Sequence, residues 1–470
     1  MEMLWGLPPS ILLLGATLLV LQLCRTIWAK RKRLPLPPGP SPLPLVGNLF
    51  DIPKTTPWVG YRDLSKKYGD LVCLQALGQT VIVVGGAQAA MDLLEKRSVN
   101  YADRPVLKLV HATGWGWSFV FAQYGQWWRD RRRVFWQHFR PDAIQKYREH
   151  QQDGVRRFLS GLTRSPDKLS EHLRYALTAI VLGSIYGMDV TEDDPNIAIF
   201  EKGLESVEFL IANSTWLEYF PALQRLPTWL PGTAVLRRIA EIREAASSIR
   251  NTPWNYCKDA LQTGNGRDCI AYSMMERISH TEDEVTAAQE DVAKDAAGVA
   301  YSGQRERFFV AMSLYPDVQK LAQAELDGVV GRSRMPEPED RDRLPYVDAL
   351  VKETLRWYPA VPMGVARRAM ESDEYGGYLI PGGATVMVNA CLMLNTSICP
   401  GRYFADTTMF LLIASVLHLF DISPRLDDHG RPILTEARPV TGVISHLEDW
   451  WHCTVKPRSS QTEKLVRDMI

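Results

Sequence analysis

The stretch from Met3 to Cys24 contains no charged residue, and it constrains the architecture of the chain more than any other feature. As a helix, its 22 residues would extend about 33 Å, enough to cross the hydrocarbon core of a bilayer. A cleaved signal peptide is the alternative, but it needs a positive charge before the apolar run, where the only charge is Glu2. Five basic residues follow the run: Arg25, Lys30, Arg31, Lys32 and Arg33. They favour an uncleaved anchor whose following domain faces the cytosol.

A proline-rich segment follows the basic residues. Positions 34–44 read Leu-Pro-Leu-Pro-Pro-Gly-Pro-Ser-Pro-Leu-Pro. Proline prevents a helix from continuing and stiffens an extended chain. We interpret residues 34–60 as a hinge that fixes the soluble domain relative to the anchor; a plain linker is the alternative.

Overall composition excludes several functional classes. The 54 Lys and Arg residues balance 54 Asp and Glu residues, so no net field draws the chain onto nucleic acid, and we expect no nucleic-acid partner. The seven cysteines are odd in number and include no C-x-x-C pair. This pattern argues against a zinc ribbon or a disulfide scaffold and favours a reducing compartment.

The body of the chain is mostly helical in pattern. Apolar residues recur at helical spacing in Ala87–Lys96, Pro141–Leu162, Ile239–Thr263, Glu282–Val299, Pro316–Val330 and Tyr346–Tyr358. Strand patterns are confined to Leu71–Leu77, Val81–Val84, Tyr378–Ile380 and Thr385–Val388. Thr407–Phe420 is almost wholly apolar but too short to cross a bilayer, so we expect a helix buried on all sides. The predicted fold class is mainly α (α+β): one large helical domain with a small sheet at each end.

An aromatic segment, Ile211–Gly232, is rich in tryptophan, tyrosine and leucine and is broken by three prolines. Core packing is one interpretation. An apolar surface that dips toward the membrane is the other.

Common catalytic signatures are absent from the sequence. There is no P-loop, no H-E-x-x-H and no G-x-S-x-G, and Gly264-Asn-Gly266 lacks the third glycine of a dinucleotide fingerprint. Three weaker motifs remain. They are the i, i+3 pair Glu353/Arg356, the i, i+4 pair Trp128/Arg132 in a basic stretch, and Cys399-Pro-Gly-Arg, which places a cysteine before a helix start. A helix N-terminus favours a thiolate, and a thiolate is an axial ligand of haem iron.

In this chain order, the anchor, the proline segment, W-R-x-x-R, E-x-x-R and C-P-G-R-x-x-A resemble the cytochrome P450 family of haem-thiolate monooxygenases. The details are similar to its membrane-bound fungal secondary-metabolism members, and the resemblance extends from about Met1 to about Arg458. The resemblance implies a haem cofactor, iron protoporphyrin IX with an axial thiolate, and a P450 fold. It also implies a role for each motif residue. Cys399 is the implied iron ligand, and Trp128 and Arg132 would contact a haem propionate, as would Arg367 or Arg368. Glu353 and Arg356 would brace the fold behind the haem.

The resemblance also implies an activity, partners and a location. We expect hydroxylation of a lipophilic small molecule with O2 and electrons from an NADPH-cytochrome P450 reductase, in secondary metabolism or xenobiotic oxidation. The expected location is the endoplasmic reticulum membrane, single-pass, with the catalytic domain cytosolic. The expected units are an anchor with its basic stop (1–33), the hinge (34–60), the haem domain (61–458) and a C-terminal tail (459–470). The arginines at 129, 131 and 133 are expected to face the reductase while Arg132 turns toward the haem.

Two segments depart from the family pattern. The family usually carries F-x-x-G-x-R-x-C, whereas residues 392–399 read Leu-Met-Leu-Asn-Thr-Ser-Ile-Cys, and Cys399 follows Glu353 by only 46 residues, several tens fewer than usual. The family's A-G-x-[DE]-T-[TS] is replaced by Ala-Gly-Val-Ala-Tyr-Ser-Gly at 297–303. The alternative is therefore a family-shaped membrane protein that is catalytically impaired or inactive.

Overall fold

The computed structural model describes residues 34–219, 229–230, 233–278, 283–299, 306–357, 359, 361–390, 399–433, 439–440, 446–447 and 453–468. The predicted anchor and its basic residues lie outside these ranges. Among the described residues, no helix has the length and apolar character needed to cross a bilayer.

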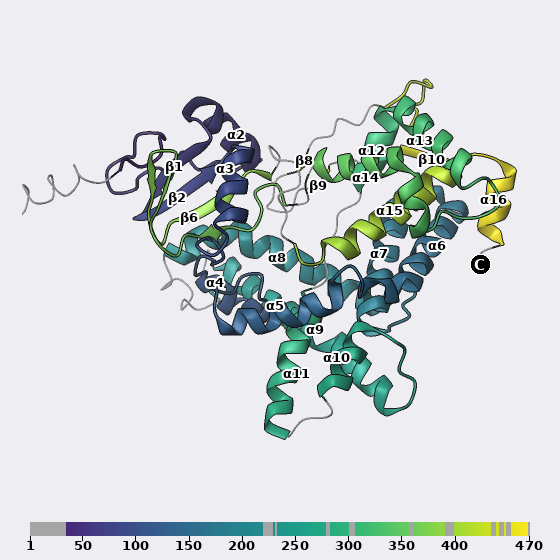
Figure 1. The fold of residues 1–470 in the computed structure, drawn as a ribbon, viewed down its shortest axis with the longest axis horizontal. Helices are drawn as coiled ribbons and strands as arrows, with labels where there is room; N and C mark the ends of the chain where they lie inside the picture. Colours follow the sequence, from purple (N-terminus) through teal and green to yellow (C-terminus); the bar gives the residue numbers. More distant parts are fainter. Residues whose placement is uncertain are drawn as a thin grey trace, which may run out of the picture.

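One four-stranded sheet joins strands from both ends of the chain. Its order is β1 (Leu71–Ala76), β2 (Gln79–Val84), β6 (Thr385–Val388) and β3 (Arg367–Arg368). β1 and β2 form an antiparallel hairpin whose turn residues, Leu77 and Gly78, have positive φ, and β2 pairs with β6 in parallel. The prediction of a separate sheet at each end was therefore wrong for Thr385–Val388, which joins the first hairpin in one sheet, seen at the left of Figure 1, whereas Tyr378–Ile380 lies in a separate two-stranded sheet.

The proline-rich segment lies against this sheet. The amide of Cys73 donates to the carbonyl of Pro38 at 2.9 Å, and the amide of Leu379 donates to that of Pro35 at 2.8 Å. The Asn48 side chain accepts from the amide of Gln75 at 2.9 Å. These bonds tie the start of the described chain to β1 and to the later strand β5.

Short elements complete this end of the molecule. They are α2 (Pro57–Tyr68), α3 (Ala87–Met91), the π-helical turn η1 (Asp92–Lys96), β4 (Asp373–Tyr375) and β5 (Tyr378–Ile380). Trp58 and Tyr61 of α2 are buried with Val72, Leu74 and Val83 of the sheet.

The helical part follows and fills the rest of Figure 1. Its longer elements are α4 (Lys108–Ala112), α5 (Gln126–Phe139), α6 (Arg148–Arg164), α7 (Leu169–Tyr186), α8 (Pro195–Tyr219), α9 (Ala234–Gln262), α10 (Ile270–Ile278), α11 (Asp283–Gly298), α12 (Glu306–Leu314), α13 (Pro316–Val329), α14 (Pro345–Trp357), α15 (Arg402–Leu419) and α16 (Ser460–Arg467). The short 3-10 turns are η2 (Trp115–Trp117), η3 (Ile144–Tyr147), η4 (Pro166–Lys168) and η6 (Pro338–Arg343). The remaining strands are β7 (Phe420–Pro424), β8 (Pro439–Val440), β9 (His446–Leu447) and β10 (Cys453–Pro457).

Helix α15 is the centre of the helical part. Every residue from Thr408 to Leu419 is buried, which confirms the prediction of a helix covered on all sides. It contacts α6, α13 and α14, and β7 continues directly from it to pair with β10. Its first turn extends out of this core: Arg402 is exposed, and Phe404 is buried.

Most predicted helices appear within a few residues of their expected bounds, whereas α7 and α8 were not predicted. α7 is buried on nearly all faces, so its sequence carries no amphipathic stripe that a helical period would reveal. Most of the aromatic segment Ile211–Gly232 lies outside the described residues or has undescribed side chains. Of it, Trp229 is described and is 77% exposed.

Candidate functional site

Cys399 lies in the turn that leads into α15. Its thiol is free and exposed, and its carbonyl accepts from the amide of Arg402 at 3.2 Å. A side-chain carbon placed on Gly401 would lie 3.9 Å from the Cys399 sulfur and 3.5 Å from the ring of Phe135. The sulfur is thus at the N-terminal end of α15, next to the face of α5 that carries Phe135.

A cluster of three arginines, Arg104, Arg132 and Arg367, accompanies this thiol; we call it the arginine cluster. Arg132 projects from α5, Arg367 from β3, and Arg104 from the loop after η1. Arg104 donates to the carbonyls of Val365 and Ala366 at 2.7 and 2.9 Å, which fixes it beside β3.

Burial governs the electrostatics of the arginine cluster. Burial, and after it the charges of the neighbouring Arg367 and Arg132, lower the pKa of Arg104 to about 9. Burial also lowers the pKa of Arg367 and of Arg132, and at Arg132 the Cys399 sulfur opposes the shift. Guanidinium groups keep their proton in proteins, so the arginine cluster presents buried positive charge that an anionic ligand could pair with.

The donor set fits the haem that the family resemblance implies. Haem needs one axial ligand to iron and cationic donors for its two carboxylates. Cys399 offers the first, and the arginine cluster offers the second. Arg104 was not predicted, because a single arginine before a proline carries no periodic or motif signal.

Arg367 and Arg368 lie on opposite sides of β3. Arg368 pairs with the buried carboxylate of Asp103 at 2.7 Å, and Asp103 also accepts from the amide of Tyr124. Adjacent strand residues face opposite ways, so only one of the two can join the cluster. Arg367 belongs to the arginine cluster, and Arg368 pairs with Asp103.

The side chains of α5 do not all face as predicted. Trp128 lies 5.7 Å from the Arg132 guanidinium, which brings the predicted pair together. Arg129 and Arg133 are exposed, but the expectation that Arg131 faces solvent was wrong. Arg131 is buried and pairs with Asp295 of α11 at 2.7 Å, because the helix turns it about 100° away from Arg132.

Glu353 and Arg356 contact each other on the surface of α14. Two hydrogen bonds of 2.6 and 2.5 Å join them, with 54% and 39% of their side chains exposed. Within the part of the chain that the structure describes, no third charged group joins this pair. The two segments that depart from the family pattern, around positions 300–305 and 391–398, lie outside the described residues.

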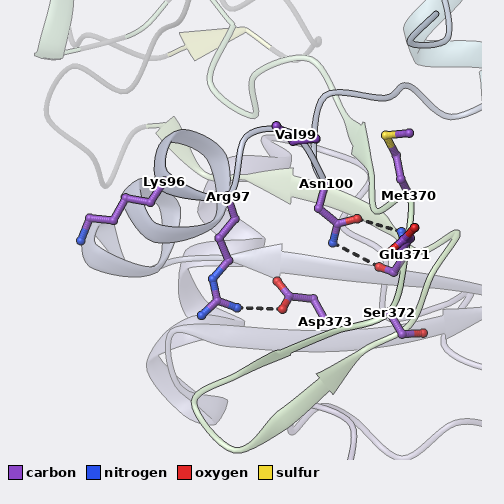
Figure 2. A pocket seen from close by; sticks show the side chains of 8 residues that line it. All are labelled: Lys96, Arg97, Val99, Asn100, Met370, Glu371, Ser372 and Asp373. Carbon is purple, nitrogen blue, oxygen red and sulfur yellow. Dashed lines mark hydrogen bonds and ion pairs between the residues drawn. The ribbon is translucent and has the colours of Figure 1, made fainter.

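A shallow surface pocket shares no residue with this site. Figure 2 shows it between the segment after η1 and the approach to β4. Arg97 pairs there with Asp373 at 2.8 Å, and Asn100 bonds to the backbone of Glu371. Its polar groups are therefore engaged in fastening two segments of the fold.

Comparison with known proteins identifies the family. The general model for cytochrome P450 matches residues 37–398. The chain is 35% identical to a cytochrome P450 monooxygenase of Armillaria gallica, over 96% of this chain and 97% of that protein. It is 33% identical to the cytochrome P450 monooxygenase COX2 of Coprinopsis cinerea, over 92% and 91% of the two chains. A third relative, claR of Ampulloclitocybe clavipes, is 35% identical over 93% and 89%. The chain belongs to the cytochrome P450 family, which makes it a haem-thiolate monooxygenase by family.

The alignments also measure what this chain lacks. The alignment with the Armillaria gallica protein has 498 positions, of which this chain fills about 451, or 96% of its 470 residues. About 47 residues of that relative therefore align with a gap in this chain. The alignment with COX2 has 479 positions, and 92% of 470 is about 432, which again leaves about 47. Relatives thus carry several tens of residues that this chain does not.

Proposed function

We propose that this chain hydroxylates a lipophilic small molecule in secondary metabolism or xenobiotic oxidation, with O2 and electrons from an NADPH-cytochrome P450 reductase. The observation that carries the proposal is the free Cys399 thiol beside the buried arginine cluster. Bound haem iron supplies the oxygen-activating chemistry. The residues of the chain would hold that group.

Each residue has a separate task in this proposal. Cys399 would hold the iron through its sulfur, and Arg104, Arg132 and Arg367 would bind the propionates. Phe135 stacks on Phe139 at 4.1 Å between ring centroids and also contacts Phe119 edge-on, so a rigid aromatic group flanks the sulfur. An apolar neighbour of this kind limits the access of water on its own side of the sulfur.

The arginine assignment is tested by haem retention. Arg367→Gln should lower the ratio of haem to purified protein, measured by pyridine haemochrome absorbance. Arg368→Gln is the matched control, because it is the next residue, has the same charge and is engaged with Asp103. Equal haem loss in both variants would contradict the assignment.

The reductase would dock where α5 presents its exposed arginines. Arg129 and Arg133 are exposed there. Arg402 of α15 is also exposed, and it lies near α5 because the next residue, Tyr403, contacts Trp136 of α5. Charge pairs of this kind steer association and weaken with salt. Reversing Arg129 and Arg133 to Glu should slow reductase association and flatten its salt dependence. Unchanged association kinetics would refute this part of the proposal.

The proposal also places the protein in a membrane. It rests on the uncharged run Met3–Cys24, followed by five basic residues. Removing residues 1–33 should move the protein from the endoplasmic reticulum membrane fraction to the soluble fraction. Continued sedimentation with membranes after alkaline carbonate washing would show that the run is not the anchor.

A second candidate function is a P450-shaped protein with little or no turnover. The exposed Glu353/Arg356 pair, the 47 missing positions and the absence of an acid–threonine pair at 297–303 favour it. Oxygen activation needs a positioned proton donor, and that sequence supplies none in the family's register. The test combines this chain with reductase, NADPH and a panel of lipophilic aromatics and terpenoids. Product formation that accounts for most of the NADPH consumed would eliminate this candidate.

A further inference from the structure

Two buried cysteines of the helical part lie in direct contact. The sulfur atoms of Cys257 and Cys269 are 3.7 Å apart, and the residues are 3% and 0% exposed. Cys257 lies in the last two turns of α9, and Cys269 directly precedes α10. The site is separate from Cys399 and plays no part in the proposed monooxygenase function.

The two sulfurs have different chemical environments. Cys269 occupies the N-cap position of α10, where its sulfur accepts from the amide of Tyr272 at 3.3 Å. A hydrogen bond joins the two sulfurs; it lowers the pKa of Cys257, while the same bond and burial raise the pKa of Cys269. The contact therefore favours Cys257 as the sulfur that loses its proton.

A third group completes the site from the end of α7. The Tyr186 hydroxyl is buried and has no hydrogen-bond partner among the described residues, and both cysteines influence its pKa. A side-chain carbon on the following residue, Gly187, would lie 3.6 Å from Cβ of Cys269. An unpartnered hydroxyl beside two sulfurs can donate to an oxygen bound to sulfur, which helps retain an oxidised intermediate.

A small oxidant could reach the two sulfurs past the short connection between α9 and α10. Residues 262–268 are all exposed and link α9 to α10, with Cys269 directly after them. Movement of this connection would admit an oxidant as small as hydrogen peroxide. Cys73 and Cys453 are also buried but lack a second cysteine in contact within the described chain, so they serve as internal references.

We propose that Cys257 and Cys269 are a modification site that hydrogen peroxide converts into an intramolecular disulfide. The Cys257 thiolate attacks one peroxide oxygen and breaks the O–O bond, giving a sulfenic acid and hydroxide, which takes up the proton lost by the thiol. The Cys269 sulfur then attacks the sulfenic sulfur and releases water. In total, two thiols lose two electrons and two protons, and one peroxide becomes two waters.

Geometry favours this second step over further oxidation. The sulfurs must close from 3.7 Å to about 2.05 Å, a change that small side-chain rotations can supply. The resulting bond ties the end of α9 to the start of α10. Both helices contact α11, so the disulfide restrains the elements that position that helix.

Trypsin gives a direct test on the full-length protein. Cleavage after Arg250, Lys258, Arg267 and Arg277 places the two cysteines on separate peptides, 251–258 and 268–277. The protein is reduced, desalted, treated with a small excess of hydrogen peroxide, alkylated and digested without reductant. The expected product is a joined peptide about 2 mass units lighter than the sum of the two, formed at least tenfold faster than Cys73 or Cys453 loses its alkylation.

Variants and alternative outcomes make the test decisive. Cys257→Ser should abolish the joined peptide while Cys453→Ser leaves it unchanged, and dithiothreitol should regenerate both free thiols. If Cys257→Ser does not fold, the wild-type peptide map and Cys269→Ser still decide. Peptides 251–258 and 268–277 recovered as alkylated thiols, as separate sulfinic acids, or joined to other cysteines would overturn the proposal.

Discussion

Removing the carboxylate of Asp295 should destabilise the fold far more than removing that of Asp291, although both pair with the same arginine. Asp295 bonds to Arg131 and Arg250 at 2.7 Å each, and its side chain is 2% exposed. Asp291 bonds to Arg250 at the same 2.7 Å but is 63% exposed. The two positions differ in burial and in the second arginine that Asp295 serves.

The magnitude follows from what each substitution leaves behind. Asp295→Ala leaves the buried Arg131 without a counter-charge, a situation that typically costs about 3–5 kcal/mol. Asp291→Ala breaks an exposed ion pair worth about 0.2–1 kcal/mol. With an unfolding entropy of about 2.1 cal/mol/K per residue and roughly 400 folded residues, each kcal/mol shifts the Tm by about 1.2 °C. We therefore expect Tm losses of about 4–6 °C for Asp295→Ala and about 1 °C or less for Asp291→Ala.

Circular dichroism melting of the two variants and the wild type measures this difference. The double variant Arg131→Met/Asp295→Leu should recover much of the loss, because it removes both buried charges and keeps apolar volume. Equal Tm values for Asp295→Ala and Asp291→Ala would refute the reasoning. Such a result would mean that solvent reaches the contact between α5 and α11.

Three further predictions concern titration and surface charge. Burial lowers the pKa of His138 to about 4. The contribution of neutral His138 to the free energy of unfolding is therefore complete above its pKa in the unfolded chain, about 6.5, and is lost as the pH falls toward 4. His138→Gln should make the urea midpoint depend less on pH in that window. The bond from Arg334 lowers the pKa of Asp340 to about 2, so its contribution is present above about pH 4 and is lost toward pH 2, a decline that Asp340→Asn should reduce in acid-unfolding curves. Glu353→Gln should lower the Tm by only about 1 °C, because its pair is exposed; a loss of several degrees would show that residues outside the described ranges cover it.

Local patterns were sufficient for the elements that depend on local chemistry. The strands β5 and β6 were predicted at their observed bounds, because alternating residues flank a Pro-Gly-Gly turn. The core helix α15 was predicted because its apolar run admits no solvent face, although it begins at Arg402 rather than at Thr407. The Cys-Pro-Gly turn that precedes it was likewise legible in the sequence.

Distant pairings were not predictable from such patterns. The parallel pairing of Val81 with Thr385 joins segments about 300 positions apart, and no local signal marks it. The sequence also does not reveal which arginine of α5 is buried. Arg131 is buried because its counter-charge, Asp295, faces it from α11. Strand alternation predicts that the side chains of Arg367 and Arg368 point to opposite faces of β3. The sequence does not show which of them joins the arginine cluster, because that depends on the buried Asp103, which pairs with Arg368.

The most direct test of the account is the carbon monoxide spectrum of the reduced full-length protein. Thiolate ligation gives a red-shifted Soret band. We predict this band in the wild type and in the control Cys453→Ala, and its loss in Cys399→Ala, because Cys399 is the exposed thiol at the start of α15 while Cys453 is buried in β10. A band that persists in Cys399→Ala, or that is absent from the wild type, would contradict the assignment of Cys399 as the haem ligand.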